Sequence, residues 1–280
     1  MALVADVMRP RAFFEILDGS LRHYRARFVP LLIPYLPQAA LILLLGLLVA
    51  MMQGSMLTDP DVIDPASALG LFGVFGIFWF LYSIAYLLGF CASVFLVASQ
   101  IDGEEIQPGQ AWRLASGRFW PIIGTALLTT LAVGFGYLVL IIPGILLSVR
   151  LMLVFQSLLL DEVAPGDALS RSWELTRGHF WRACGFLLFL TILTMIMSGP
   201  SQITSMIPWV FLNDEGEIAN RVGFYGAMAI SQLLAAGVNL LVAPLTTLVF
   251  THLYVDLRVR REGMDFDGRL RELDAKRQGA

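Results

Sequence analysis

Cysteine, histidine and charged residues are scarce in this chain of 280 residues. Only 15% of the residues are charged, whereas 57% are hydrophobic and the mean hydropathy is +0.73. No soluble domain could bury that much apolar surface, so the composition predicts a polytopic membrane protein. The formal net charge of -3 gives no reason to expect a nucleic-acid partner.

The two cysteines, Cys91 and Cys184, lie in separate apolar runs without metal-ligand spacing. We expect both to pack in the interior, because this spacing favours neither a disulfide nor a zinc site. The sequence also lacks a nucleotide loop and a nucleophile elbow, since "GLFGVFG" at 70–76 lies inside an apolar run. We therefore expect no cofactor and no bound metal.

Long apolar runs dominate what is present. A helix needs roughly 20 apolar residues to cross a bilayer core, and five runs reach that length while a sixth is shorter. The runs are residues 28–53, 69–99, 119–141, 145–160, 183–207 and 223–253. The short run follows Pro143-Gly144, a helix-breaking pair expected to form a tight turn after the third run. The sequence predicts an all-α membrane protein with six transmembrane helices as three hairpins.

Basic residues gather on one side of these runs. Of the 19 Lys and Arg residues, 17 lie before the first run, after the sixth, or in the two connectors on the same side. The other connectors hold Arg221 and two acidic clusters, at 59–64 and 214–217. Because positive charge marks cytoplasmic loops, both termini are expected in the cytoplasm, at a bacterial inner membrane. We expect a single integral membrane domain over 1–280, with a cytoplasmic amphipathic N-terminus (1–27), a six-helix bundle (28–253) and a cytoplasmic tail (254–280).

A short pattern recurs where the first, third and fifth runs begin. The copies are "RARFVPLL" at 25–32, "SGRFWPII" at 116–123 and "RGHFWRAC" at 177–184. Each copy places a basic residue or histidine before a phenylalanine, as expected where a helix enters the headgroup region. The expected interfacial anchors are Phe28, Phe119, Trp120, Phe180 and Trp181.

Stretches upstream of the pattern predict amphipathic interfacial helices on the cytoplasmic side. Before the first run, an apolar stripe consists of Phe14, Leu17, Leu21, Tyr24 and Phe28. Before the fifth, a stripe of Leu169, Trp173, Thr176 and Phe180 lies opposite Arg171, Glu174 and Arg177. A threefold repeat of surface helices is one interpretation. The other is that any inward loop of a membrane protein gathers arginine and aromatic residues.

Three stretches carry a family resemblance. They are "IIPGILLSVRLMLVFQSLLLDE" from residue 141, "ALSRSWELTRGHFWR" from residue 168 and "LYVDLRVRREGMDFD" from residue 253. They resemble the bacterial glycerophosphoryl diester phosphodiesterase membrane domain family, most strongly over 141–182 and 244–267. The resemblance implies a multi-helix inner-membrane module, found in some relatives beside a separate hydrolase domain and in others alone, whose own activity is poorly defined.

The residues of that hydrolase domain are missing. The resemblance implies for it an acidic metal-binding set, a His-Arg pair and a second histidine, whereas His23, His179 and His252 are the only histidines and none precedes Arg. No Asp or Glu lies well inside the six runs, so a carboxylate proton relay has no evident members. A lipid-cleaving site at the cytoplasmic face would have only Asp161, Glu162 and His179.

Arg150 lies inside the fourth run without an acidic partner nearby. Three outcomes are open. The side chain extends to the interface, or it bonds to helix carbonyls and to amides such as Asn239, Gln156 or Gln38, or it binds an anion, most naturally a lipid phosphate.

Three arginines, Arg258, Arg260 and Arg261, follow the sixth run directly. They fit a signal that stops transfer and sets orientation. Alternatively, Asp256 pairs with a neighbouring arginine and docks the tail, while the other arginines hold anionic headgroups.

These patterns favour a non-catalytic inner-membrane module that engages anionic lipid or a partner protein, including a second copy of the chain, in envelope and phospholipid homeostasis. The candidate anion or lipid-binding residues are Arg150, Asn239, Arg171, Arg177, His179, Arg258, Arg260 and Arg261. Two alternatives stay open. One is a transporter or flippase of a small or lipidic solute, with a cavity lined by Arg150, Asn239, Gln38 and Gln232, and the other is a membrane-embedded lipid hydrolase.

Overall fold

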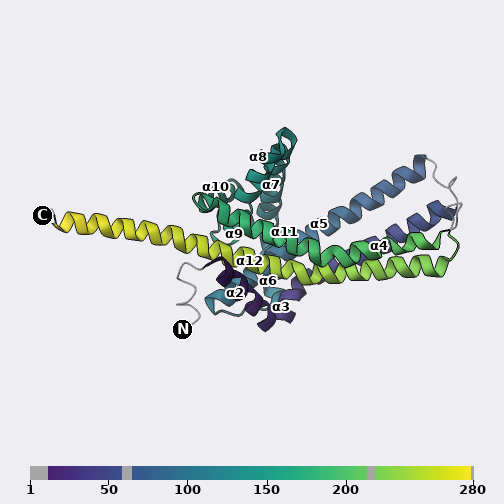
Figure 1. The fold of residues 1–280 in the computed structure, drawn as a ribbon. Helices are drawn as coiled ribbons and strands as arrows, with labels where there is room; N and C mark the ends of the chain where they lie inside the picture. Colours follow the sequence, from purple (N-terminus) through teal and green to yellow (C-terminus); the bar gives the residue numbers. More distant parts are fainter. Residues whose placement is uncertain (1–11, 59–64, 213–217, 279–280) are drawn as a thin grey trace. The chain divides into compact units, whose positions relative to one another are not determined.

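The computed structural model in Figure 1 describes residues 12–58, 65–212 and 218–278. These residues form helices and contain no β-strand, only an isolated bridge between Leu212 and Ile218. The α-helices are α2 (Phe13–Ala26), α3 (Phe28–Leu32), α4 (Leu36–Thr58), α5 (Pro65–Asp102), α6 (Pro108–Gly117), α7 (Phe119–Val139), α8 (Ile141–Arg150), α9 (Val154–Leu160), α10 (Pro165–Thr176), α11 (Phe180–Thr204) and α12 (Arg221–Gln278). Two 3-10 helices are η1 (Ile33–Tyr35) and η3 (Ile207–Phe211). The all-α prediction is confirmed for this part of the chain.

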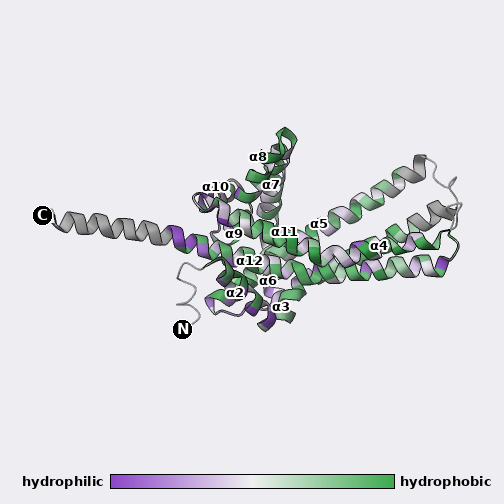
Figure 2. Cartoon of the chain, viewed as in Figure 1, coloured by the Kyte–Doolittle hydropathy of each residue, from purple (hydrophilic) through white to green (hydrophobic). Residues whose placement is uncertain are grey.

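Six stretches of these helices are long and apolar enough to cross a membrane. They are Phe28–Met52, Phe72–Asp102, Phe119–Val139, Ile141–Leu160, Phe180–Phe211 and Arg221–Arg261. Their surfaces expose large apolar side chains, such as Leu138 (83% exposed) and Ile142 (78%). Figure 2 shows hydrophobic residues along α8 and α11, and hydrophilic residues on α10. An apolar surface of this extent is typical of a multi-pass membrane protein.

The chain divides into two compact units. Unit 1 comprises Met1–Leu31, Cys91–Phe189 and Leu245–Ala280, and unit 2 comprises Leu32–Phe90 and Leu190–Pro244. The helices α5, α11 and α12 therefore contribute residues to both units, whereas α2 and α6 to α10 belong to unit 1 alone.

The junction between α7 and α8 corrects the predicted helix break. The chain leaves the helical conformation at Leu140, which has φ -163° and ψ 153°. Pro143 and Gly144, the predicted break, lie instead in the first turn of α8. A proline is tolerated there because the first amide groups of a helix have no intrahelical acceptor to lose.

Two glycines let α7 and α8 approach closely. A Cβ atom added to Gly136 would lie 3.1 Å from the Cα of Gly144 and 2.7 Å from Leu147 Cδ1. A Cβ atom on Gly144 would lie 2.4 Å from the ring of Tyr137. Gly144 thus provides space between two packed helices and does not end one.

The fourth candidate span is not one continuous helix. α8 ends at Arg150, the chain turns over Leu151–Leu153, and α9 begins at Val154. The carbonyl oxygen of Arg150 accepts hydrogen bonds from the hydroxyls of Ser172 (2.8 Å) and Thr176 (3.4 Å) on α10. These bonds satisfy a carbonyl group that has no partner within its own helix at the end of α8.

Candidate functional site

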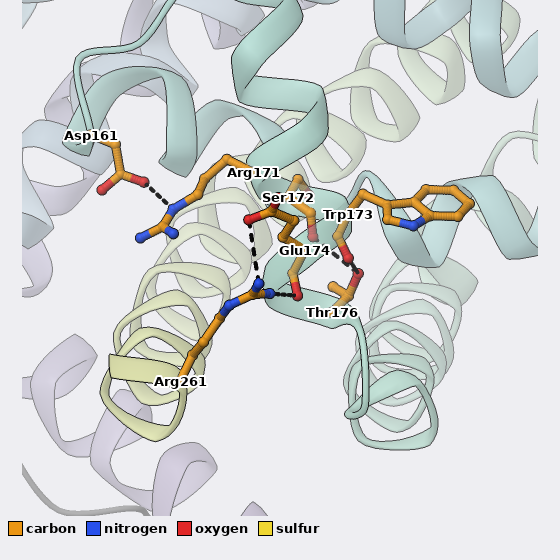
Figure 3. A network of polar contacts seen from close by, with 7 residues as sticks. All are labelled: Asp161, Arg171, Ser172, Trp173, Glu174, Thr176 and Arg261. Atoms are coloured by element: carbon orange, nitrogen blue, oxygen red, sulfur yellow. Dashed lines mark hydrogen bonds and ion pairs between the residues drawn. The ribbon is translucent and has the colours of Figure 1, made fainter. Parts of the chain in front are cut away.

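The end of α9 meets α10 and α12 in a cluster of ion pairs within unit 1. Asp161, directly after α9, lies 3.1 Å from the Nε of Arg171 and 3.2 Å from Nη1 of Arg258. Only 10% of the Asp161 side chain is exposed. Figure 3 shows Arg171 reaching Asp161 while Arg261 approaches Glu174 on α10. This arrangement joins α12, through Arg258 and Arg261, to the end of α9 and to α10.

A second ion-pair cluster surrounds Asp256 on α12. Its Oδ2 lies 3.0 Å from Nη2 of Arg182 on α11 and 2.9 Å from the Nε of Arg260 one turn further along α12. The Asp256 side chain is only 1% exposed. This geometry agrees with the alternative in which Asp256 pairs with a neighbouring arginine.

Arg118 makes a further ion pair at the end of α9. Its guanidinium pairs with Glu162 and also donates to the carbonyl oxygen of Leu159 at 3.3 Å. A cation at this position is favourable because the carbonyl groups at a helix C-terminus carry partial negative charge. Glu162 adopts a left-handed backbone conformation, with φ 54°.

Four of the predicted lipid-binding arginines are therefore engaged within the protein. Arg171, Arg258, Arg260 and Arg261 each pair with a carboxylate. Headgroup binding at these positions would have to compete with an internal ion pair. The two acids proposed for a lipid hydrolase, Asp161 and Glu162, are also paired with arginines. Among the described residues, no three His, Cys, Asp or Glu side chains form a cluster suited to a metal.

His179 lies between α10 and α11, near the Asp256 cluster. Burial lowers the pKa of His179, and the charges of Arg260 and Arg182 lower it further, against opposing effects of Asp256 and a backbone hydrogen bond to Arg177. The neutral ring is therefore favoured near pH 7. A neutral imidazole contributes little to anion binding.

Arg150 has a different environment from the paired arginines. Its guanidinium carbon lies 5.1 Å from the ring centroid of Trp173 and 5.3 Å from that of Phe180. The Nε and Nη1 atoms are buried and have no hydrogen-bond partner among the described residues. Each cation–π contact contributes about 0.5 to 2 kcal/mol. This does not replace the hydrogen bonds that the guanidinium makes in water, since each buried unsatisfied donor costs about 1 to 3 kcal/mol.

None of the amides predicted as possible partners of Arg150 makes a hydrogen bond with its guanidinium. In unit 2, Gln38 donates to Asn239 at 3.0 Å and to Tyr82 at 3.4 Å. Gln156 is fully buried in unit 1, and neither of its amide atoms has a partner among the described side chains and backbone. Gln232 lies against Gly46 in unit 2. Three of the four residues predicted to line a transport cavity thus belong to unit 2, and Arg150 belongs to unit 1.

The predicted anchors repeat one geometry. The rings of Phe119 and Trp120 meet edge to face at 5.3 Å and 78°, and those of Phe180 and Trp181 at 5.6 Å and 77°. Trp120 is 78% exposed and Trp181 83% exposed. At the first copy, Phe28 meets the ring of Tyr24 edge to face at 5.3 Å.

The sequence pattern missed two exposed arginines that remain available for a ligand, Arg25 and Arg113. Within the described residues, the guanidinium groups of Arg25, Arg113 and Arg177 are exposed and make no ion pair. Only Arg177 was among the predicted candidates. These arginines differ from the paired ones because no acid lies within reach of them. That property depends on contacts between segments distant in the sequence, so the sequence pattern could not show it.

Comparison with known proteins identifies a family without naming an activity. Residues 114–257, just over half of the chain, match a domain of unknown function, DUF7847. No curated protein and no solved structure matches the chain. The resemblance to the phosphodiesterase membrane domain therefore stays a prediction. By the match over residues 114–257, the chain belongs to the DUF7847 family.

Proposed function

We propose that the chain is a non-catalytic membrane module that engages anionic lipid through α2, α6 and α10. The observation that carries the proposal is the division of α2 into three faces. Ile16 and Ser20 are fully buried in unit 1, whereas Phe14, on the next face, is 78% exposed. Successive residues of a helix are about 100° apart, so the apolar face of Phe14 and Leu21 lies between the buried face and a charged one.

The charged face of α2 carries its exposed ionisable residues. They are Glu15, Asp18, Arg22 and Arg25. A helix in water and protein alone needs two faces, one buried and one polar. A helix at a membrane surface needs a third, apolar face for lipid, with cations beside it for headgroups. The three faces of α2 match that requirement.

The same division recurs in α10. Ala168, Ser172 and Leu175 are buried, while Trp173 is 39% exposed and Glu174 is exposed. Arg177, directly after the helix, is also exposed. In the shorter α6, Ala111 and Ala115 are buried and Arg113 is exposed. Recurrence in three separate helices supports lipid contact as a common role.

The proposal includes the location and topology of the chain. We place it in a bacterial inner membrane as three hairpins with both termini in the cytoplasm, because 17 of its 19 basic residues fall on one side of the apolar runs. The resemblance to the phosphodiesterase membrane domain family supports a role in phospholipid homeostasis. Anionic lipids of the inner leaflet would lie beside α2, α6 and α10.

Lipid selectivity in reconstituted bilayers tests the proposal. Spin-labelled phosphatidylglycerol and phosphatidylcholine would be compared for the fraction immobilised on the protein. We expect the wild type to favour phosphatidylglycerol at low salt. The triple variant R25Q/R113Q/R177Q should lose about 1 kcal/mol of this preference for each arginine near the surface.

The matched control is Arg221→Gln. Arg221 is exposed and begins α12 on the side where acidic residues predominate. This variant removes one cation and should leave the selectivity unchanged. Equal selectivity in the triple variant and the wild type would refute the proposal.

A further inference from the structure

Arg150 is a permanently charged group without a counter-charge among the described residues. The carboxylates of this region are already engaged: Asp161 with Arg171 and Arg258, Glu162 with Arg118, Glu174 with Arg261, and Asp256 with Arg182 and Arg260. Arg150 makes neither an ion pair nor a guanidinium hydrogen bond with them. Four carboxylates thus serve six arginines in this region, and none of them is left for Arg150.

Two aromatic rings lie next to the Arg150 guanidinium. Trp173 comes from α10 and Phe180 from the start of α11, and both rings lie within 5.3 Å of the guanidinium carbon. Aromatic rings satisfy the faces of a guanidinium but none of its N–H groups, which point outward in the plane. Such an edge fits the oxygen atoms of a phosphate group, which accept parallel N–H donors.

The position along the helices favours a headgroup over the bilayer centre. The carbonyl oxygen of Arg150 bonds to Ser172 on α10, and α10 exposes Glu174 and Arg177 on another face. An exposed charged face fits the surface position that the proposed function gives to α10. With α10 at that surface, Arg150 would lie at headgroup level, although it occupies the middle of an apolar run in the sequence.

We propose that Arg150, held between Trp173 and Phe180, binds a phosphate group, supplied by a phospholipid headgroup or by a small phosphate compound. The inference deepens the proposed function by naming a discrete site, and it rests on that function only for the expectation that the ligand is a lipid. Arg150 is partly exposed and supplies the charge. Because Nε and Nη1 are buried, Nη2 is the guanidinium nitrogen from which a phosphate oxygen can accept a hydrogen bond.

A titration of the delipidated protein in a neutral, phosphate-free detergent tests this site. The probes are short-chain phosphatidylglycerol, diacylglycerol of the same chain length and inorganic phosphate, and the readout is the thermal midpoint. We expect saturable stabilisation by a phosphate-bearing probe and none by diacylglycerol. Phosphatidylglycerol alone acting indicates a lipid site, and inorganic phosphate acting indicates a site for the free group. Arg150→Gln should weaken the binding by about tenfold or more.

Two further variants keep the outcome decisive. Trp173→Leu leaves the charge in place but removes one ring, and it should weaken binding severalfold, so it serves if Arg150→Gln does not fold. The triple variant R25Q/R113Q/R177Q should keep the saturable site even where it loses bulk lipid selectivity, which separates this inference from the proposed function. Stabilisation by diacylglycerol as strong as by phosphatidylglycerol, no stabilisation by any phosphate probe, or unchanged affinity in the folded Arg150 or Trp173 variant would overturn the site.

Discussion

Asp256 is a carboxylate withdrawn almost completely from solvent, with 1% of its side chain exposed. A buried charge is tolerated when it is paired, and here Arg182 and Arg260 share it. Because Arg182 belongs to α11 and Asp256 to α12, the pair ties two helices together within unit 1. Asp256, Arg182 and Arg260 stabilise the fold as a set, since removing one member leaves a buried charge without its counter-charge.

We expect Asp256→Asn to destabilise the protein by about 3 to 5 kcal/mol, because two arginines would lose their shared counter-charge. The measurement is the thermal midpoint in detergent. Asp18→Asn is the control: Asp18 pairs with Arg22 at 2.7 Å, but its side chain is 65% exposed, so the change should stay within about 0.5 kcal/mol. Similar small effects of both substitutions would contradict a structural role for Asp256.

The pairing of charged residues was only partly accessible from the sequence. Asp256 and Arg260 are four residues apart, a spacing that predicts contact on one helix face. Glu174 and Arg261 are 87 residues apart, and no local pattern relates them. The arginines of the tail therefore resembled free headgroup ligands. Their partners became visible only with the folded chain.

At the scale of the helices, six candidate spans were predicted and six are present. The length of the apolar runs is enough for this prediction. In lipid, the backbone of a single segment can satisfy its hydrogen bonds only by forming a helix. The division of the fourth span was not predicted. It depends on Ser172 and Thr176, which reach the end of α8 from a different helix.

The contact between α7 and α8 gives a prediction at this scale. Gly136→Ala should destabilise the protein by about 1 to 3 kcal/mol, because the added carbon meets the backbone of Gly144 and forces the helices apart. Gly134→Ala in the same helix has no atom within 4 Å of the new Cβ. It should be neutral or stabilising by up to about 1 kcal/mol. Thermal midpoints of the two variants decide the matter, and a larger loss in Gly134→Ala would count against the close packing.

The surface helices show where periodicity gives incomplete information. The stripe predicted for a surface helix exposes Phe14 and Leu21, whereas Ile16, which lies outside the stripe, is buried. A pattern with one apolar and one polar face describes two environments. A helix between protein, lipid and water meets three, so apolar character alone could not distinguish the buried face from the lipid-facing one.

For the molecule as a whole, the strongest signal is the unequal distribution of charge about the apolar runs. Arg221 is the one basic residue in the connectors that we assign to the far side. The two acidic clusters of those connectors, at 59–64 and 214–217, lie outside the described residues. The assignment of sides thus rests on the sequence and on the rule for positive charge.

Topology can be measured with reporter fusions. Alkaline phosphatase, which is active only outside the cytoplasm, should be active when fused after Asp64 or Glu217 and inactive when fused after Gly178. The physical reason is that positive loops are retained on the cytoplasmic side. Activity in the reverse pattern would place the termini outside the cell and remove the basis for contact with the inner leaflet.

The interruption after Arg150 also has a consequence for biogenesis. The apolar residues of α8 are six: Ile141, Ile142, Ile145, Leu146, Leu147 and Val149. Together they favour entry into the bilayer by only roughly 2 to 4 kcal/mol, and the 10 residues of α8 are about half the length that crosses a bilayer core. The segment alone is therefore too short to span the membrane. It would enter lipid as a pair with α7, against which it packs closely at Gly136 and Gly144, so the interruption after Arg150 implies that the two helices insert together.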